Sequence, residues 1–228
     1  MNAIRRAALL GAMAVAVIAV LAGCGQSGPP EQGLLITGPG IRATQPPWTP
    51  QYVGLAQRIK TLGLPTGDSE KFHIHAQLSV YDQGLLVTVP ANLGIDERHH
   101  VETTIHTHDR TGIVHMEAPR RYPYTLGDLF AIWGVRFGAG TLGGLQDDGS
   151  NRVWVYVNGT RITDPARHVI ANGDDISIGY GPPNSFPHKP GTYLLKQVMS
   201  GKSDLTCTGG PVKKQKACLA PKHPTPKG

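Results

Sequence analysis

Alternating apolar and polar positions predict a β-hairpin that begins near residue 72. In the segment FHIHAQLSVY, the even-numbered positions 74–80 are apolar, while the odd-numbered positions 73–79 carry His, His, Gln and Ser. Because side chains alternate between the two faces of a strand, we expect one face to pack on a core and the other to stay polar. Gln83 and Gly84 then supply a turn before the next apolar run, LLVTVP.

Three further segments show a similar two-residue alternation of apolar and polar positions. Residues 101–117 predict a second hairpin, interrupted by the loop DRTG, and residues 152–163 predict a third. The third hairpin turns at Asn158 and Gly159, a dipeptide that is favoured in two-residue hairpin turns. The sequence DISIGYG at 175–181 predicts a last strand.

The segment before the first hairpin has the spacing of apolar residues that is typical of a helix. Apolar residues spaced by three and four positions between 55 and 62 share one face of a predicted helix. We expect this helix to begin with Thr49 as the N-cap and Pro50 in the first turn, and to end at Gly63.

A second short helix is predicted between the second and third hairpins, over residues 126–133. Thr125 is its N-cap, Asp128 occupies the capping-box position, and Gly134 ends it. Hairpins, a helix and further strands together predict an α+β fold, mainly antiparallel, with one or two short helices. This order of elements is similar to that of a β-grasp domain.

The first residues have the layout of a secretory signal. Arg5 and Arg6 precede an uncharged stretch at 7–22, and residues 1–23 are therefore interpreted as a signal peptide. The following LAGC resembles the lipobox of bacterial lipoproteins, which implies cleavage before Cys24 and attachment of a diacylglyceryl group to its sulfur. The resemblance implies a lipid-anchored protein on the extracytoplasmic face of the cell membrane; a plain membrane anchor with an incidental cysteine is the alternative.

The mature chain divides by composition into three parts. Residues 24–47 are rich in Gly and Pro and predict a tether, residues 48–195 a single α+β domain, and residues 196–228 a basic tail. The tail contains seven Lys and one Asp, so its net charge of +6 accounts for the basic character of the chain. A solvated tail is favoured over a nucleic-acid contact, and no nucleic-acid partner is expected.

Two cysteines, Cys207 and Cys218, flank a lysine cluster in this tail. Outside the cytoplasm they can close a loop, and with Cys24 lipidated no free thiol remains. We therefore expect a disulfide, because the spacing does not suit a C-x-x-C metal knuckle.

Histidine is the most unusual feature of the composition. Seven of the ten histidines lie between residues 73 and 115, and they include two H-x-H pairs. In a strand, positions i and i+2 point the same way, so each pair presents two imidazoles on one face. If DRTG is a four-residue hairpin loop, His106 lies opposite His115 and Thr104 lies opposite Glu117.

This arrangement predicts a metal site on the sheet. His106, His108 and His115 form its centre, His73 or His75 completes the coordination when the first hairpin packs alongside, and Glu117 is a candidate carboxylate ligand. Taken singly, Glu117 can instead pair with Arg120 or Arg121, and Asp109 can accept a hydrogen bond in its turn. The adjacent His99 and His100 are interpreted as surface residues.

The strings FHIHAQLSVY, IHTHDRTGIVHME, YTLGDLFAIWG and VYVNG together resemble an uncharacterised family of exported or membrane-tethered prokaryotic proteins. The resemblance covers about residues 55–181 and implies a location rather than an activity. A cupin requires a glutamate four or five residues after the second histidine of its H-x-H, where this chain has Gly112 and Ile113.

The leading functional prediction is a lipid-anchored protein that binds a divalent transition metal. Imidazoles without thiolates suit Zn(II) or Cu(II), and Met116, on the opposite strand face from His115, disfavours Cu(I). A metal-dependent hydrolase with Glu117 as general base is one alternative, and a metal-free cell-surface interaction module is another. No G-x-S-x-G or Walker motif is present, so esterases and nucleotide hydrolases have no support.

Overall fold

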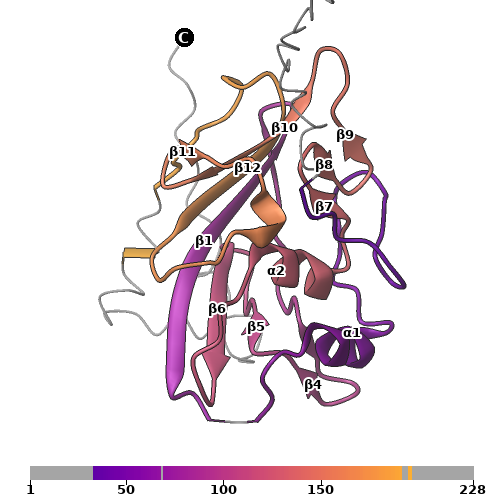
Figure 1. Cartoon of the computed structure of the whole chain (residues 1–228), viewed down its shortest axis with the longest axis vertical. Helices are drawn as coiled ribbons and strands as arrows, with labels where there is room; N and C mark the ends of the chain where they lie inside the picture. Colours follow the sequence, from indigo (N-terminus) through magenta and orange to yellow (C-terminus); the bar gives the residue numbers. More distant parts are fainter. Residues whose placement is uncertain (1–32, 68, 192–194, 197–228) are drawn as a thin grey trace, which may run out of the picture. The chain divides into compact units, whose positions relative to one another are not determined.

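The computed structural model describes residues 33–67, 69–191 and 195–196, and a seven-stranded mixed sheet is its largest element (Figure 1). The strands lie in the order β11-β10-β12-β1-β6-β5, with β2 paired to β1. Their bounds are β1 Phe72–Asp82, β2 Leu85–Val87, β5 Ile105–His106, β6 Ile113–Ala118, β10 Arg152–Val157, β11 Thr160–Arg161 and β12 Asp175–Gly181. The expected α+β fold class is confirmed.

Both tight hairpin turns form where the sequence predicts them. Gln83 and Gly84 join β1 to β2 with φ of 49° and 80°, and Asn158 and Gly159 join β10 to β11 with φ of 54° and 85°. A two-residue turn that matches the twist of its strands needs positive φ at both positions, which Asn and Gly adopt readily.

The centre of the sheet contains a parallel pair that the hairpin pattern did not predict. β1 pairs in parallel with β12, with Leu78 opposite Ile176 and Val80 opposite Ile178. Both strands also have an antiparallel neighbour, β6 for β1 and β10 for β12. The centre of the sheet is therefore a parallel pair with an antiparallel pair on each side.

The second predicted helix is confirmed as α2, Leu126–Trp133. The Thr125 hydroxyl accepts a hydrogen bond from the Asp128 N–H at 3.0 Å, and the Asp128 carboxylate accepts one from the Thr125 N–H at 2.8 Å. This reciprocal capping box satisfies two N–H groups that the first helical turn leaves without partners. Gly134, with φ of 73°, ends the helix as expected.

The first helix, α1 Leu55–Leu62, is shorter than predicted. It ends at Gly63 as expected, but its N-cap is Gly54, so the predicted start at Thr49 and Pro50 is wrong. The Arg58 guanidinium donates hydrogen bonds to the carbonyls of Gln51 and of Val53, the latter at 2.7 Å. These side-chain hydrogen bonds satisfy two backbone carbonyls that backbone N–H groups would satisfy in a helix. The segment before Gly54 is irregular, because its carbonyls have these partners without helical hydrogen bonds.

The remaining elements are short. They are β3 Ile95–Asp96, β4 Val101–Glu102, β7 Phe137–Gly138, β8 Thr141–Leu142, β9 Leu145–Gln146 and the 3₁₀ helix η1 Pro165–Arg167. β3 pairs with β4, and β7, β8 and β9 form a separate three-stranded sheet. Among the described residues, no helix has the length and apolar character needed to cross a membrane.

One face of the large sheet is covered by the main core. Ala76, Leu78 and Val80 of β1 and Met116 of β6 are at most 1% exposed and belong to one cluster with residues of α2. Since side chains alternate along a strand, the neighbouring odd-numbered positions of both strands face the other side. The histidines of these strands are therefore held on the face opposite the core.

Part of the predicted tether packs on the domain. The Ile36 N–H donates to the Phe137 carbonyl at 2.7 Å, and the Arg42 N–H donates to the Gly134 carbonyl at 2.9 Å. The signal peptide, Cys24, the tail beyond residue 196 and the disulfide expected between Cys207 and Cys218 lie outside the described residues.

Candidate metal centre

The candidate site is built on three adjacent strands, β1, β6 and β5. Strand register places His75 opposite His115 and His73 opposite Glu117 across the β1–β6 pair. His106 lies opposite His115 across the β5–β6 pair, as the sequence predicts. The Glu117 N–H also donates to the Thr104 carbonyl at 3.0 Å, which agrees with the expected alignment of these two residues. Five of the six predicted ligand candidates are thereby brought to one patch of the sheet, and His108 follows β5 in the adjoining loop.

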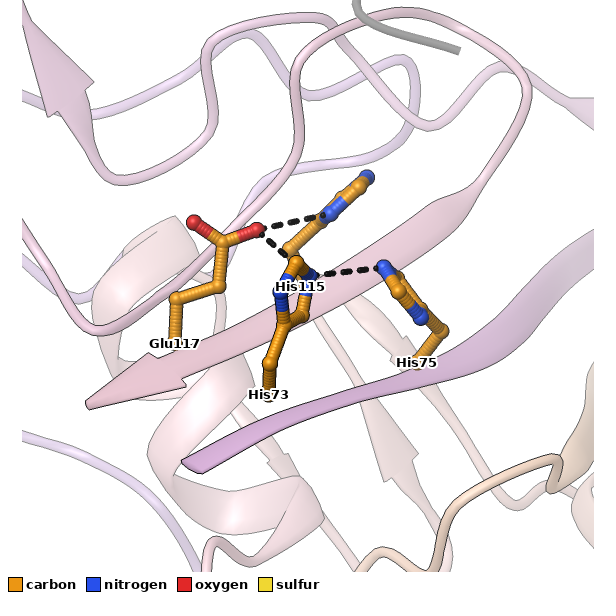
Figure 2. A group of neighbouring side chains, drawn as sticks. All are labelled: His73, His75, His115 and Glu117. Carbon is orange, nitrogen blue, oxygen red and sulfur yellow. Dashed lines mark hydrogen bonds and ion pairs between the residues drawn. The ribbon is translucent and has the colours of Figure 1, made fainter. Parts of the chain in front are cut away.

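Figure 2 shows the part of the site on β1 and β6, where three imidazoles and a carboxylate point toward one another. The Nε2 atoms of His73 and His75 are 3.0 Å apart. Glu117 Oε1 lies 3.0 Å from His73 Nε2 and 3.1 Å from His115 Nδ1. The sequence predicted that one of His73 and His75 would reach the site, and the structure places both there.

The second part of the site contains His106 and His108, whose Nε2 atoms are 3.2 Å apart. His106 Nδ1 lies 2.8 Å from the Thr103 carbonyl oxygen. A carbonyl only accepts hydrogen bonds, so Nδ1 carries the proton and the lone pair is on Nε2. This lone pair faces His108, and Glu117 Oε2 lies 3.7 Å from the same nitrogen.

His115 and Glu117 belong to both parts. The ligand atoms of His73, His75, His115 and Glu117 all lie within 4.8 Å of one another, and so do those of His106, His108, His115 and Glu117. The centroid of the His115 ring is 4.6 Å from that of His75 and 4.5 Å from that of His108. Each set holds three imidazoles and one carboxylate, a donor set typical of transition-metal sites.

Burial keeps two of the imidazoles neutral. Desolvation, with His108 adding repulsion, lowers the pKa of His106 from 6.5 to about 4, although Glu117 and the Thr103 carbonyl act in the opposite direction. Desolvation together with His115 and His73 lowers the pKa of His75 to about 4 as well. Metals bind neutral imidazole, so at neutral pH these two ligands need not lose a proton first.

Glu117 is held ionised although burial alone would raise its pKa. The hydrogen bond from His115 and the proximity of His106 and His73 outweigh desolvation and lower its pKa to about 2. Its contacts are with histidines, and the ion pair with Arg120 or Arg121 that the sequence left open is not formed in the part of the chain that the structure describes.

The other sequence predictions for this region agree with the structure. Asp109 Oδ1 accepts a hydrogen bond from the Thr111 N–H at 2.8 Å and shapes the DRTG turn. His99 and His100 are exposed, and His99 pairs with Asp96 at 2.7 Å rather than joining the cluster. Met116 is fully buried in the core, on the face away from His115.

Three contributors at the edge of the site were not predicted. Glu70 Oε2 lies 3.6 Å from His73 Nδ1, and Glu102 Oε1 lies 3.8 Å from His106 Nε2. The third is the Thr103 carbonyl that fixes the His106 tautomer. A backbone carbonyl carries no signal in the sequence, and Glu70 lies before the predicted strand that carries His73. Glu102 stands four residues before His106, a spacing that the strand period places on the same face, so the pattern could have revealed it.

Comparison of the chain with protein-family models, with curated proteins and with solved structures gives no match.

Proposed function

We propose that the protein is a lipid-anchored, extracytoplasmic protein that binds a divalent transition metal through His106, His108, His115 and Glu117. The observation that carries the metal proposal is the convergence of these four side chains from β5, β6 and the adjoining loop onto one patch of sheet. The location rests on the sequence, through Arg5, Arg6, the apolar stretch and LAGC before position 25.

The spacing of the donor atoms supports Zn(II) or Cu(II). Ligands of a tetrahedral zinc ion with bonds of about 2.0–2.1 Å are separated by about 3.3 Å. His106 Nε2 and His108 Nε2, at 3.2 Å, already stand near this separation. Since Met116 faces the core, the described site offers only nitrogen and oxygen donors, which suit these ions better than Cu(I).

Binding is favoured over hydrolysis because of the surroundings of Glu117. A general base works best when its pKa lies near the operating pH, whereas the neighbouring histidines hold the pKa of Glu117 below its ordinary value. Both of its carboxylate oxygens also face imidazoles of the cluster. These contacts suit a metal ligand better than a group that must accept a proton from water.

Removal of two ligands tests the site. We expect the double variant His106→Asn/His108→Asn to bind Zn(II) and Cu(II) more than about 100-fold more weakly than the parent, since even outer partners of ligands contribute about 10–100-fold. Isothermal titration calorimetry of the metal-free full chain measures both affinities. The matched control is His99→Asn/His100→Asn, because these histidines are exposed and Asn tolerates the φ of 53° at His100.

Equal affinities in the parent and the His106/His108 variant would contradict the metal site. A parent that binds no tighter than its own urea-unfolded form would do so as well. Either result would favour the metal-free interaction module.

The membrane anchor is tested separately at Cys24. In its host, the parent protein is expected to partition into detergent, because two acyl chains give stable anchoring. A Cys24→Ala variant is expected to keep its unprocessed signal segment and to lack the mass of the lipid. Unchanged processing and membrane retention of this variant would contradict lipidation at Cys24.

A further inference from the structure

The six ligand candidates form two sets, each built on one H-x-H pair. The Nε2 atoms are 3.0 Å apart in the His73/His75 pair and 3.2 Å apart in the His106/His108 pair. Both separations are near the roughly 3.3 Å expected for two donors on one tetrahedral ion. Each pair therefore places two ring nitrogens at a separation that one ion can accept, although in the metal-free protein the same contacts are His–His hydrogen bonds.

Glu117 lies between the two pairs and turns a different oxygen toward each. Its Oε1 is 3.0 Å from His73 Nε2, and its Oε2 is 3.7 Å from His106 Nε2. A carboxylate with this orientation can bind one ion through each oxygen. His115 also stands between the pairs, with its ring close to those of His75 and His108.

The outer surroundings repeat for the two pairs. One histidine in each pair has its Nδ1 beside an outer acceptor, Glu70 for His73 at 3.6 Å and the Thr103 carbonyl for His106 at 2.8 Å. Such partners orient a ligating imidazole and direct its Nε2 into the site. Glu70 beside the first pair and Glu102 beside the second add one exposed carboxylate to each side, so three carboxylates, with Glu117, stand near the two H-x-H pairs.

We propose that the site holds two divalent transition-metal ions, one on each H-x-H pair, bridged by Glu117. The inference rests on the proposed function and extends it, since a single four-coordinate ion leaves two of the five histidines without a metal. Two-metal sites hold their ions about 3.5–4 Å apart through shared ligands, and Glu117 is placed to be one.

Metal content distinguishes one ion from two. The full chain, loaded with Zn(II) and freed of unbound metal by gel filtration, is expected to retain two ions per chain by mass spectrometric elemental analysis. The variants His73→Asn/His75→Asn and His106→Asn/His108→Asn are each expected to retain one. The His99→Asn/His100→Asn control is expected to retain two.

Electron paramagnetic resonance of the Cu(II)-loaded protein tests the bridge. Two Cu(II) ions that share Glu117 are expected to couple, so that the parent gives much less than the signal of two isolated spins. Each double variant, with one Cu(II), is expected to give the full signal of one spin. A parent signal equal to two isolated spins would overturn the bridge.

Each other outcome has a distinct meaning. One ion in the parent that disappears in both variants indicates a single shared site, and one ion that disappears only in the His106/His108 variant indicates the proposed site alone. Both results overturn the two-ion inference and leave the proposed function standing. A folded parent that retains no ion, as judged by its circular dichroism, overturns both.

Discussion

Acidification of the metal-free protein from pH 6.5 to about 4 is expected to remove roughly 3 kcal/mol of its free energy of unfolding through His106 alone. His106 is 1% exposed, and desolvation lowers its pKa in the folded protein to about 4. In the unfolded chain its pKa is the ordinary 6.5, so between these values the unfolded chain binds a proton that the folded chain does not. Stability therefore falls as the pH falls through this window, and the effect is absent above it.

Urea unfolding of the chelator-treated protein at several pH values in this window measures the effect. The free energy of unfolding is expected to fall by about 1 kcal/mol per pH unit because of this histidine. The His106→Asn variant, whatever its stability, is expected to show a correspondingly shallower slope. His75, whose pKa burial also lowers, acts in the same direction in both proteins and cancels in the comparison. Identical slopes would show that His106 titrates alike in the folded and unfolded chains.

The low pKa of His106 also changes the expected pH dependence of metal binding. From the sequence alone, every imidazole has its ordinary pKa, which predicts a steep loss of affinity near pH 6.5. In the structure, His106 and His75 become protonated only near pH 4, so their share of the loss moves to lower pH. Burial thus keeps these two imidazoles neutral, which is the form that binds metal, at a pH where exposed histidines are partly protonated.

The sequence predicts the local features of the fold well because they depend on near neighbours. The alternation over residues 73–80 assigns the core face and the histidine face of β1, and the capping box at Thr125 marks the start of α2. The same information cannot reveal that β1 lies beside β12, since about a hundred residues separate them and either strand's pattern fits many partners. The start of α1 was mispredicted because Arg58 supplies hydrogen bonds to the preceding segment.

In the candidate site, too, the local features could be predicted from the sequence and the long-range pairings could not. The His106–His115 alignment could be predicted, because a short loop fixes the register of a hairpin. The positions of His73 and His75 beside Glu117 and His115 depend on the long-range β1–β6 pairing, so the sequence left open which of them takes part. Glu117, for which an ion pair with arginine was the simpler alternative, is instead surrounded by imidazoles.

The arrangement also explains how one sheet serves both packing and chemistry. β6 places Val114 and Met116 in the core and His115 and Glu117 on the opposite face. Each of these residues therefore serves either the packing of the core or the candidate metal site. The buried side fixes the backbone that carries the ligands. Metal bound on the other face is therefore expected to add to the stability of the same strands.

Metal binding is therefore expected to raise the melting temperature of the protein, and Glu117 is the ligand on which this rise depends most. Zn(II) at a free concentration about 100 times its dissociation constant adds about 2.7 kcal/mol to the free energy of unfolding, because metal binds the folded site and much less the unfolded chain. For a chain of this length, each kcal/mol corresponds to about 2–4 °C, so the melting temperature should rise by roughly 5–10 °C.

Glu117→Gln is expected to abolish most of this shift. Glu117 is the only carboxylate within both described ligand sets, and Gln keeps its size while removing the negative charge that a divalent cation attracts. If affinity falls about 100-fold, the same Zn(II) concentration then stabilises by only about 0.4 kcal/mol, or roughly 1 °C. Differential scanning calorimetry with and without a chelator measures both shifts, with His99→Asn/His100→Asn as the control that keeps the full rise. Equal shifts in the parent and in Glu117→Gln would show that the imidazoles hold the ion without the carboxylate, and would remove Glu117 from the ligand set.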